Sequence, residues 1–130
     1  MKRTEFVRKT PMARTGAALN RATFKRRAPK RRAGHDSTYL AACRGQRCYL
    51  AITGICSHDR ATVVPAHSNQ SKHGKGMGIK AQDVYTVPAC FACHHEIDQG
   101  SRFTRDEKTQ IWDAAYARWS TDRQAMQEAR

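Results

Sequence analysis

Four of the five cysteines in this chain have a spacing that predicts a metal site. One pair, Cys48 and Cys56, encloses seven residues, and a second pair, Cys90 and Cys93, encloses two. Two separated cysteine pairs can supply the four thiolates of a tetrahedral zinc site. Because the N-terminus has no apolar stretch typical of a secretory signal, we expect these thiols to bind metal rather than to form disulfides. The sequence therefore predicts one structural zinc ion.

The fifth cysteine, Cys43, leaves an alternative assignment open. It could pair with Cys48, four residues further on, but Cys56 would then have no partner. We interpret Cys43 as a small residue on one face of a helix. A thioredoxin-like role for Cys90 and Cys93 is disfavoured, because the strand and helix patterns around them are too short.

Polar residues directly after the second cysteine pair suit a second metal site. His94 and Asp98 are four residues apart, which places both on one face of a helix. An imidazole and a carboxylate there can hold one divalent ion and leave positions open for water and phosphate oxygens. The alternative is an ordinary exposed helix face, and His95 would replace His94 in a different helix register.

A histidine upstream is a candidate proton acceptor. His67 ends a β-branched stretch, residues 62–67, that predicts a strand. A neutral imidazole can take a proton from an attacking water near physiological pH, so His67 is a candidate general base. Asp83 can orient His67 or support the loop between them. A purely structural histidine is the alternative interpretation.

Positive charge is concentrated at the start of the chain. The net charge is +13, and residues 1–35 contribute +11 through twelve Lys and Arg residues and one acid, Glu5. This segment has too few apolar residues to order itself, so it predicts a disordered arm that binds nucleic acid, with a solubilising tail as the alternative. The glycine-rich loop around residue 76 lacks the spacing of a phosphate-binding P-loop. The residues expected to contact nucleic acid are Lys25, Arg26, Arg27, Lys30, Arg31, Arg32, Lys75 and Lys80.

The remaining patterns predict an α+β domain, residues 36–130, behind the arm of residues 1–35. A first helix runs to Cys43 from a cap at Asp36 or Ser37, and another follows Cys93 and ends at Gly100. The expected strands are residues 49–52, 62–67 and 84–87. A capping box at Thr104 and Glu107 starts the last helix. The apolar stripe of that helix, which we expect in the core, is Ile111, Trp112, Ala115, Tyr116 and Trp119.

Taken together, these motifs resemble the phage and prophage HNH-like nucleases related to the recombination-enhancement nuclease Ref. The resemblance covers roughly residues 38–119 and rests on the cysteine pairs, Ala66-His67, the glycine- and lysine-rich loop with Asp83, and the string from Cys90 to Asp98. It implies a small zinc-stapled ββα-metal (HNH-like) domain with a C-terminal helix. It also implies that His67 is the general base and that His94 and Asp98 bind a catalytic Mg²⁺ or Mn²⁺.

The implied function is metal-dependent hydrolysis of DNA phosphodiester bonds in phage recombination or DNA processing. The implied setting is the cytoplasm of a bacterial host, with DNA and a recombinase filament as partners and no membrane, since no apolar run is long enough to span one. Two departures are visible: the standard Asn-His spacing is absent, and Ala66 stands where many relatives have a metal-binding Asp or His. The rival hypotheses are a non-catalytic zinc DNA-binding module and an RNA-binding or ribosome-associated zinc protein.

Overall fold

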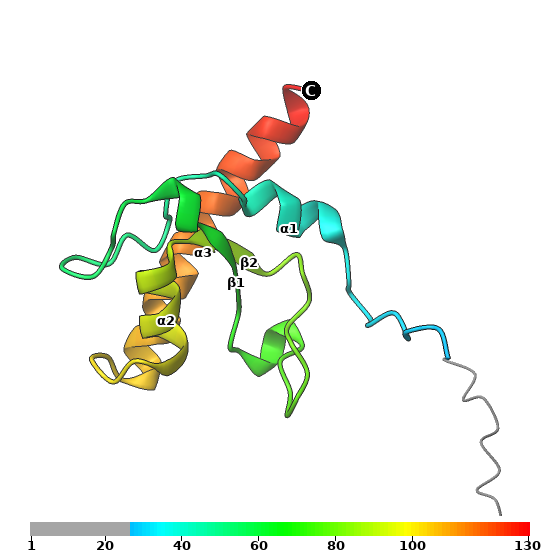
Figure 1. The fold of residues 1–130 in the computed structure, drawn as a ribbon, viewed down its shortest axis with the longest axis horizontal. Coiled ribbons are helices and arrows are strands. Elements are labelled where there is room, and N and C mark those ends of the chain that lie inside the picture. Colours follow the sequence, from blue (N-terminus) through cyan, green and yellow to red (C-terminus); the bar gives the residue numbers. More distant parts are fainter. Residues whose placement is uncertain (1–26) are drawn as a thin grey trace, which may run out of the picture. The chain divides into compact units, whose positions relative to one another are not determined.

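The computed structural model describes residues 27–130, which contain three α-helices and one two-stranded antiparallel sheet. The helices are α1 (Ser37–Cys43), α2 (Phe91–Gln99) and α3 (Arg105–Glu128), and the strands are β1 (Val64–His67) and β2 (Thr86–Ala89) (Figure 1). Short 3₁₀ turns lie at Arg60–Thr62 and Ser71–His73. The small α+β architecture expected from the sequence is therefore present in this part of the chain.

Residues 31–130 form one compact unit. The domain boundary expected at residue 36 stays a prediction. Lys25 and Arg26 lie outside the described residues, as does most of the predicted arm, so its disorder and its nucleic-acid contacts stay predictions.

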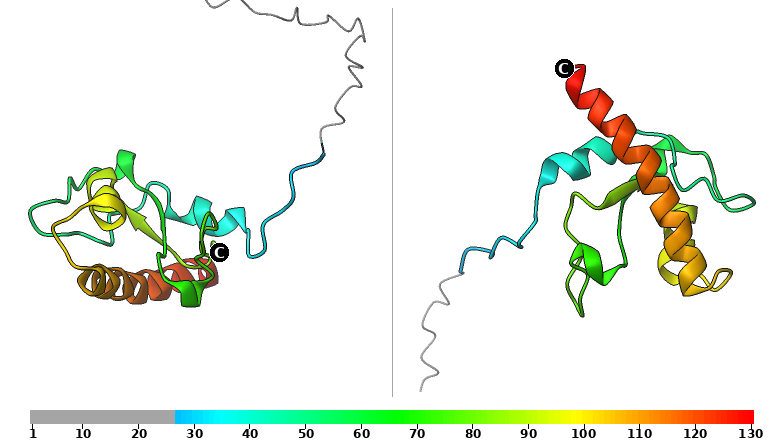
Figure 2. Two further views of the ribbon diagram at one scale, coloured as in Figure 1. Left: turned by 90° about the horizontal axis from the view of Figure 1, so that it is seen from below. Right: turned by 180° about the vertical axis from the view of Figure 1, so that it is seen from behind.

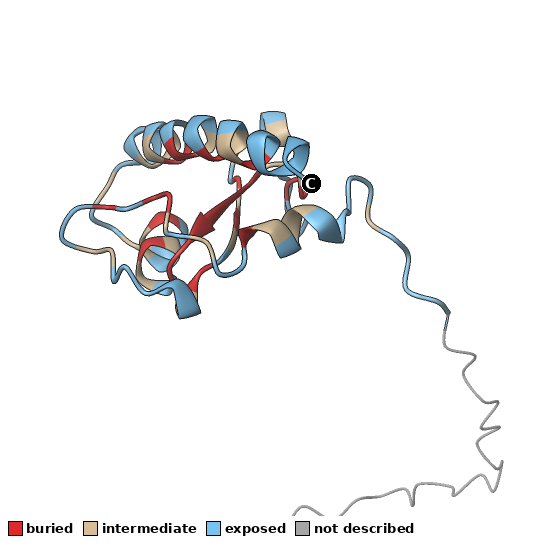
Figure 3. Ribbon diagram, turned by 90° about the horizontal axis from the view of Figure 1, so that it is seen from above, coloured by how far each residue is buried: buried red, intermediate tan, exposed pale blue. Residues whose placement is uncertain are grey.

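The sheet is a hairpin whose centre is covered by other elements. Its register pairs Val64 with Ala89 and His67 with Thr86, and it places Pro65 opposite Pro88. Proline has no N–H to donate, so this central pair adds no ladder hydrogen bond. The Pro88 carbonyl instead accepts a 2.9 Å bond from the Tyr49 N–H. In two views, α3 runs along one side of the hairpin, and α1 and α2 lie on the other (Figures 2 and 3).

The long helix α3 supplies the largest buried side chains. Its capping box is confirmed: the Glu107 N–H donates to Thr104 Oγ1 at 3.3 Å, and the Thr104 N–H donates to the Glu107 carboxylate at 2.7 Å. The apolar stripe is confirmed as core, because Trp112, Ala115 and Trp119 are buried (Figure 3). Apolar burial on this scale provides most of the stability of a small domain.

The strand expected at residues 49–52 is wrong. After the Tyr49 N–H binds β2, the backbone turns away, and Ala51 adopts a left-handed φ of 40°. This turn directs the Ala51 N–H to the Cys48 sulfur at 3.4 Å. The requirement to bring a cysteine to its partners thus overrides the strand propensity of Tyr49-Leu50-Ala51-Ile52.

The other expected elements are found with shifted ends. β2 begins at Thr86 rather than Val84, because a turn closes first, with the Tyr85 N–H on the Gln82 carbonyl at 3.0 Å and the Thr86 hydroxyl on the Asp83 carbonyl at 2.8 Å. β1 begins after a 3₁₀ turn that the Asp59 side chain caps. The helix expected up to Cys43 is confirmed. The helix expected after Cys93 is also found and ends before Gly100, but it begins at Phe91 and so contains Cys93.

Candidate functional site

The two cysteine pairs meet in one cluster. The Sγ atoms of Cys48, Cys56, Cys90 and Cys93 all lie within 4.8 Å of one another. Zn–S bonds of about 2.3 Å in a tetrahedron set the sulfurs about 3.8 Å apart, and the Cys56 and Cys90 sulfurs are 3.8 Å apart. Four thiolates at this separation could bind a metal such as zinc. Within residues 27–130, no other set of three or more His, Cys, Asp or Glu side chains is close enough to share one ion.

The local backbone prepares these sulfurs for a cation. The Ala51 and His58 N–H groups point to the Cys48 and Cys56 sulfurs, each at 3.4 Å. Burial, together with the neighbouring Cys48 and Cys90 sulfurs, raises the pKa of the Cys93 thiol well above its usual range. Burial also acts to raise the pKa of the Cys90 thiol, but hydrogen bonds outweigh it and lower that pKa to about 6. A divalent ion would favour the thiolate form of all four cysteines, because it would offset the repulsion between four such charges.

Cys43 lies outside the cluster, in agreement with its interpretation as a helix-face residue. Its buried Sγ lies 3.5 Å from the Tyr39 carbonyl and 3.7 Å from the Thr86 hydroxyl. Burial raises the pKa of this thiol to about 11, so it stays protonated.

Helix α2 presents His94, directly after Cys93, and Asp98, one turn further on, on the same face. Their Nε2 and Oδ2 atoms are 3.0 Å apart, and the Asn69 amide donates to Asp98 Oδ1 at 2.9 Å. The contact with His94 lowers the pKa of Asp98. Burial acts to raise it, but the hydrogen bond from Asn69 lowers it further, and the net shift is downward. An ionised carboxylate beside an imidazole could contribute two ligands to a divalent ion. His95 is exposed and makes no such contact with Asp98.

His67 and Asp83 form the second polar pair. His67 Nε2 lies 2.8 Å from Asp83 Oδ1, and the Asp83 side chain is fully buried. Burial lowers the pKa of His67, and Asp83 opposes this only in part. Burial also acts to raise the pKa of Asp83, but hydrogen bonds from His67, the Asp36 N–H and Arg32 outweigh it and lower the pKa to about 2. At neutral pH the pair is thus a neutral imidazole against a carboxylate.

Nothing in the sequence indicated that the Asp83 side chain would bind the residues at the end of the predicted arm. Arg32 forms an ion pair with Asp83 Oδ1 and donates to the Ala81 carbonyl at 3.1 Å. His35 Nδ1 and the Asp36 N–H reach Asp83 Oδ2 at 2.8 and 2.9 Å. Arg32 stands in a run of basic residues, and nothing in that run distinguishes it from its exposed neighbours, Lys30 and Arg31.

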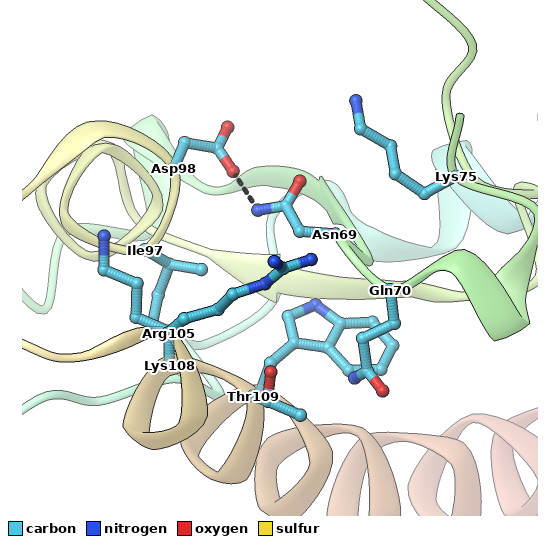
Figure 4. Close-up of a pocket in the computed structure, with 9 residues that line it drawn as sticks. Asn69, Gln70, Lys75, Ile97, Asp98, Arg105, Lys108 and Thr109 are labelled. Atoms are coloured by element: carbon cyan, nitrogen blue, oxygen red, sulfur yellow. Dashed lines mark hydrogen bonds between the residues drawn. The ribbon is translucent and has the colours of Figure 1, made fainter. Parts of the chain in front are cut away.

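The two polar pairs line different hollows. His67 lines one of about 870 Å³ with Arg32, His35 and Lys80. Asp98 lines another of about 400 Å³, drawn in Figure 4, with Asn69 and Lys75. The loop between η2 (Ser71–His73) and β2 contributes to both, so the predicted nucleic-acid contacts Lys75 and Lys80 each lie beside one pair. Asn69 is two residues beyond His67 and links its strand to Asp98.

A family model described as "Putative nuclease YbcO" matches residues 37–128, which include the cysteine cluster and both polar pairs, so the chain belongs to that family. "Putative nuclease YbcO" of Escherichia coli (strain K12) and "Putative nuclease ybcO" of Enterobacteria phage 82 are each 36% identical to this chain over 77 residues, 59% of this chain and 71% of the relative. A solved structure, titled "Structure of a putative bacteriophage protein from Escherichia coli str. K-12 substr. MG1655", has 31% identity and a TM-score of 0.44, and the match covers 59% of this chain and 84% of that one.

The family model and the two named relatives confirm the expected relation to a phage-associated nuclease family. The closer kinship with HNH-like nucleases and with Ref stays a prediction. Among the described residues, no helix is long and apolar enough to cross a membrane.

The cysteine cluster generates a prediction for metal content and folding. Wild type should retain about one zinc per chain and unfold cooperatively. The replacement Cys90→Ser should abolish both properties, because the free energy of metal binding is part of the free energy of folding in such sites. Elemental analysis after dialysis and a thermal melt measure the two. Cys43→Ser is the matched control and should retain both. Retention of zinc and a cooperative melt by Cys90→Ser would contradict the assignment.

The His67–Asp83 pair generates a prediction for proton binding. NMR titration should give His67 a pKa below its usual 6.5, and Asp83→Asn should lower it further, because the anion that favours the imidazolium is lost. The folded state then binds this proton less readily than the unfolded chain, so His67 destabilises the fold as the pH falls below about 6.5. Asp98→Asn serves as the control and should leave the His67 titration unchanged. A wild-type value above 6.5 would refute the assigned environment.

Proposed function

We propose that this protein is a metal-dependent DNA endonuclease in which His67 is the general base, Asp83 positions it, and His94 and Asp98 bind the catalytic ion. The observation that carries the proposal is the contact between His67 and the buried Asp83. A half-buried neutral imidazole fixed by an ionised carboxylate is the arrangement that general-base chemistry needs.

The contact decides which ring nitrogen can accept a proton. Asp83 is ionised, so His67 Nε2 carries the hydrogen and donates it to Oδ1. The lone pair then remains on Nδ1, which is the atom that would take a proton from water. The lowered pKa of His67 keeps this atom unprotonated at neutral pH.

The His94–Asp98 pair suits a hard cation with few protein ligands. Mg²⁺ is commonly bound by one or two carboxylates and keeps several waters, so two side chains are enough to place it. When bound, the ion would supply positive charge to the phosphate and to the departing 3′ oxygen. Asn69 holds the Asp98 carboxylate at 2.9 Å, and Ala66 contributes no ligand, in line with the departure seen in the sequence.

The two hollows belong to one site in this proposal, because Asn69, two residues beyond His67, bonds Asp98 and so joins the strand of the base to the proposed ion site. The loop that carries Lys75 and Lys80 borders both, and a continuous sugar–phosphate backbone can occupy both at once. Phosphate contacts of this kind hold a strand without reading its sequence. The family match and the phage relative support a role in phage DNA processing, to which a recombinase partner would belong.

The second candidate is a non-catalytic zinc DNA-binding module. The scarcity of ligands favours it, since within residues 27–130 only the cysteine cluster offers three or more metal-binding side chains. In that case the cysteine cluster would bind zinc and the basic arm would bind DNA. His67 would only supply a hydrogen-bond partner for the buried Asp83 carboxylate.

Cleavage assays distinguish the two candidates. Wild type should cut plasmid or single-stranded DNA with Mg²⁺ or Mn²⁺, and His67→Ala should lose about a hundredfold to ten-thousandfold in rate while keeping zinc and DNA binding. Asp98→Ala should lose activity that excess Mn²⁺ partly restores. His95→Ala is the control and should cleave like wild type. Cleavage by His67→Ala at the wild-type rate would show that the base is assigned wrongly.

The arm is tested by two truncations that differ in five residues. Removing residues 1–30 removes a net charge of +9 and should weaken DNA binding and flatten the dependence of log K on log salt, because fewer counterions are released. Removing residues 1–35 should in addition lower the melting temperature, because Arg32 and His35 leave Asp83. An unchanged salt slope in the first truncation would make the arm a solubilising tail.

A further inference from the structure

The hollow beside Asp98 is built by four separate segments. Asn69 and Gln70 follow β1, Lys75 comes from the loop before β2, Asp98 ends α2, and the first turns of α3 close the far side (Figure 4). Its volume is about 400 Å³, and the buried Ile97 and Trp112 form its apolar lining. The space is therefore a defined concavity rather than a gap between two exposed side chains.

The cations that line this hollow outnumber its anions. The lining includes three cations, Lys75, Arg105 and Lys108, and one anion, Asp98. Lys108 donates to the Gly100 carbonyl at 2.5 Å. Arg105 and Lys75 make no hydrogen bond or ion pair with the residues that the structure describes. Asp98 is already bonded to His94 and Asn69, so it does not neutralise either of these two cations by direct contact.

The unmatched cations approach the hollow from opposite sides. Figure 4 shows the Arg105 side chain reaching across the hollow toward Asn69, with Lys75 beyond Asn69. Lys75 is close enough to Asp98 to contribute to the lowering of its pKa. A planar guanidinium binds phosphate through two parallel N–H bonds, and a nearby ammonium adds a point charge. The ligand that suits this set is a phosphate group.

We infer that this hollow binds an internal backbone phosphate of the nucleic-acid substrate, adjacent to the phosphate held at His94 and Asp98. The inference rests on the proposed function, because Asp98 lines the hollow and also belongs to the proposed ion site. A second phosphate bound here fixes the direction in which the strand leaves Asp98. It also makes the protein select a polynucleotide over a mononucleotide, since a mononucleotide cannot occupy both positions.

The salt dependence of binding tests this subsite without any need for cleavage. Anisotropy of a labelled oligonucleotide is measured with zinc-loaded full-length protein in buffer freed of other divalent ions. Arg105→Gln should lower the slope of log K against log salt by about 0.9 for duplex and about 0.7 for single-stranded DNA, one phosphate contact. Lys75→Gln should do the same, and the double variant should lose about one contact rather than two, because both side chains hold one phosphate.

Matched controls separate this subsite from general charge loss. Arg44→Gln removes the same charge from an exposed residue at the end of α1, outside the hollow, and should leave the slope unchanged. Zinc retention and thermal melting confirm that each variant folds. Unchanged slopes for both Arg105→Gln and Lys75→Gln, or an equal loss for Arg44→Gln, would overturn the inference.

The source of the phosphate is distinguished by the ends of the probe. Oligonucleotides of equal length with and without a 5′ phosphate should give the same loss in Arg105→Gln, because the bound group is internal. A loss confined to the 5′-phosphorylated probe would assign the hollow to a strand end and overturn the internal site. If Arg105→Gln lowers the salt slope relative to wild type but wild type cleaves no DNA, the subsite stands and the proposed nuclease function fails. If wild type cleaves DNA but Arg105→Gln and Lys75→Gln leave the salt slope unchanged, the proposed nuclease function stands and the phosphate subsite fails.

Discussion

The position of the candidate site depends on the convergence of four cysteine sulfurs. The sheet has only two strands of four residues, and a hairpin of this size is marginal in water. The cluster joins the segment from Cys48 to Cys56 to the start of α2, since Cys90 caps that helix and Cys93 lies in its first turn. The orientation of α2, and with it the position of His94 and Asp98, follows from bonds that a metal ion would close.

A second constraint is electrostatic. Asp83 has no exposed side-chain surface, and a buried carboxylate is stable only when its oxygens are bonded. Its partners come from the end of the arm and from β1, so one carboxylate connects segments more than thirty residues apart in the chain. The same bonds that stabilise this carboxylate set the tautomer of His67. Structural and chemical demands therefore fall on one side chain, which makes Asp83→Asn informative about both.

Local patterns predicted much of this structure because their signals are local. The capping box at Thr104, the apolar stripe through Trp119 and the four-residue spacing of His94 and Asp98 depend only on helix periodicity. The cysteine spacing predicted the cluster because two separated cysteine pairs can together supply the four ligands of one tetrahedral metal site. The strand expected at residues 49–52 failed because its propensity gave no sign of the turn that brings Cys48 to its partners.

The candidate site was less predictable where it depends on contacts between distant segments. Arg32 looks like any residue of a basic arm, and only the folded chain shows that its guanidinium reaches Asp83. Asn69 carries no motif, yet it bonds Asp98 across 29 positions. The hollow near Asp98 draws on four segments whose relative positions no single periodicity encodes. Several of these residues could be chosen from the sequence as candidates, but the distant residues that they contact could not be predicted from it.

Ala66 has a consequence for the metal ligands that this fold can carry. It is 1% exposed within the same core cluster as Val87 and Trp112, and its carbonyl accepts a 3.4 Å bond from the Trp112 indole. A carboxylate or imidazole at position 66 would have to enter that core. A polar group buried there without a hydrogen-bond partner would be costly. A ligand at position 66 therefore demands a rearranged core, which one substitution at that position does not supply.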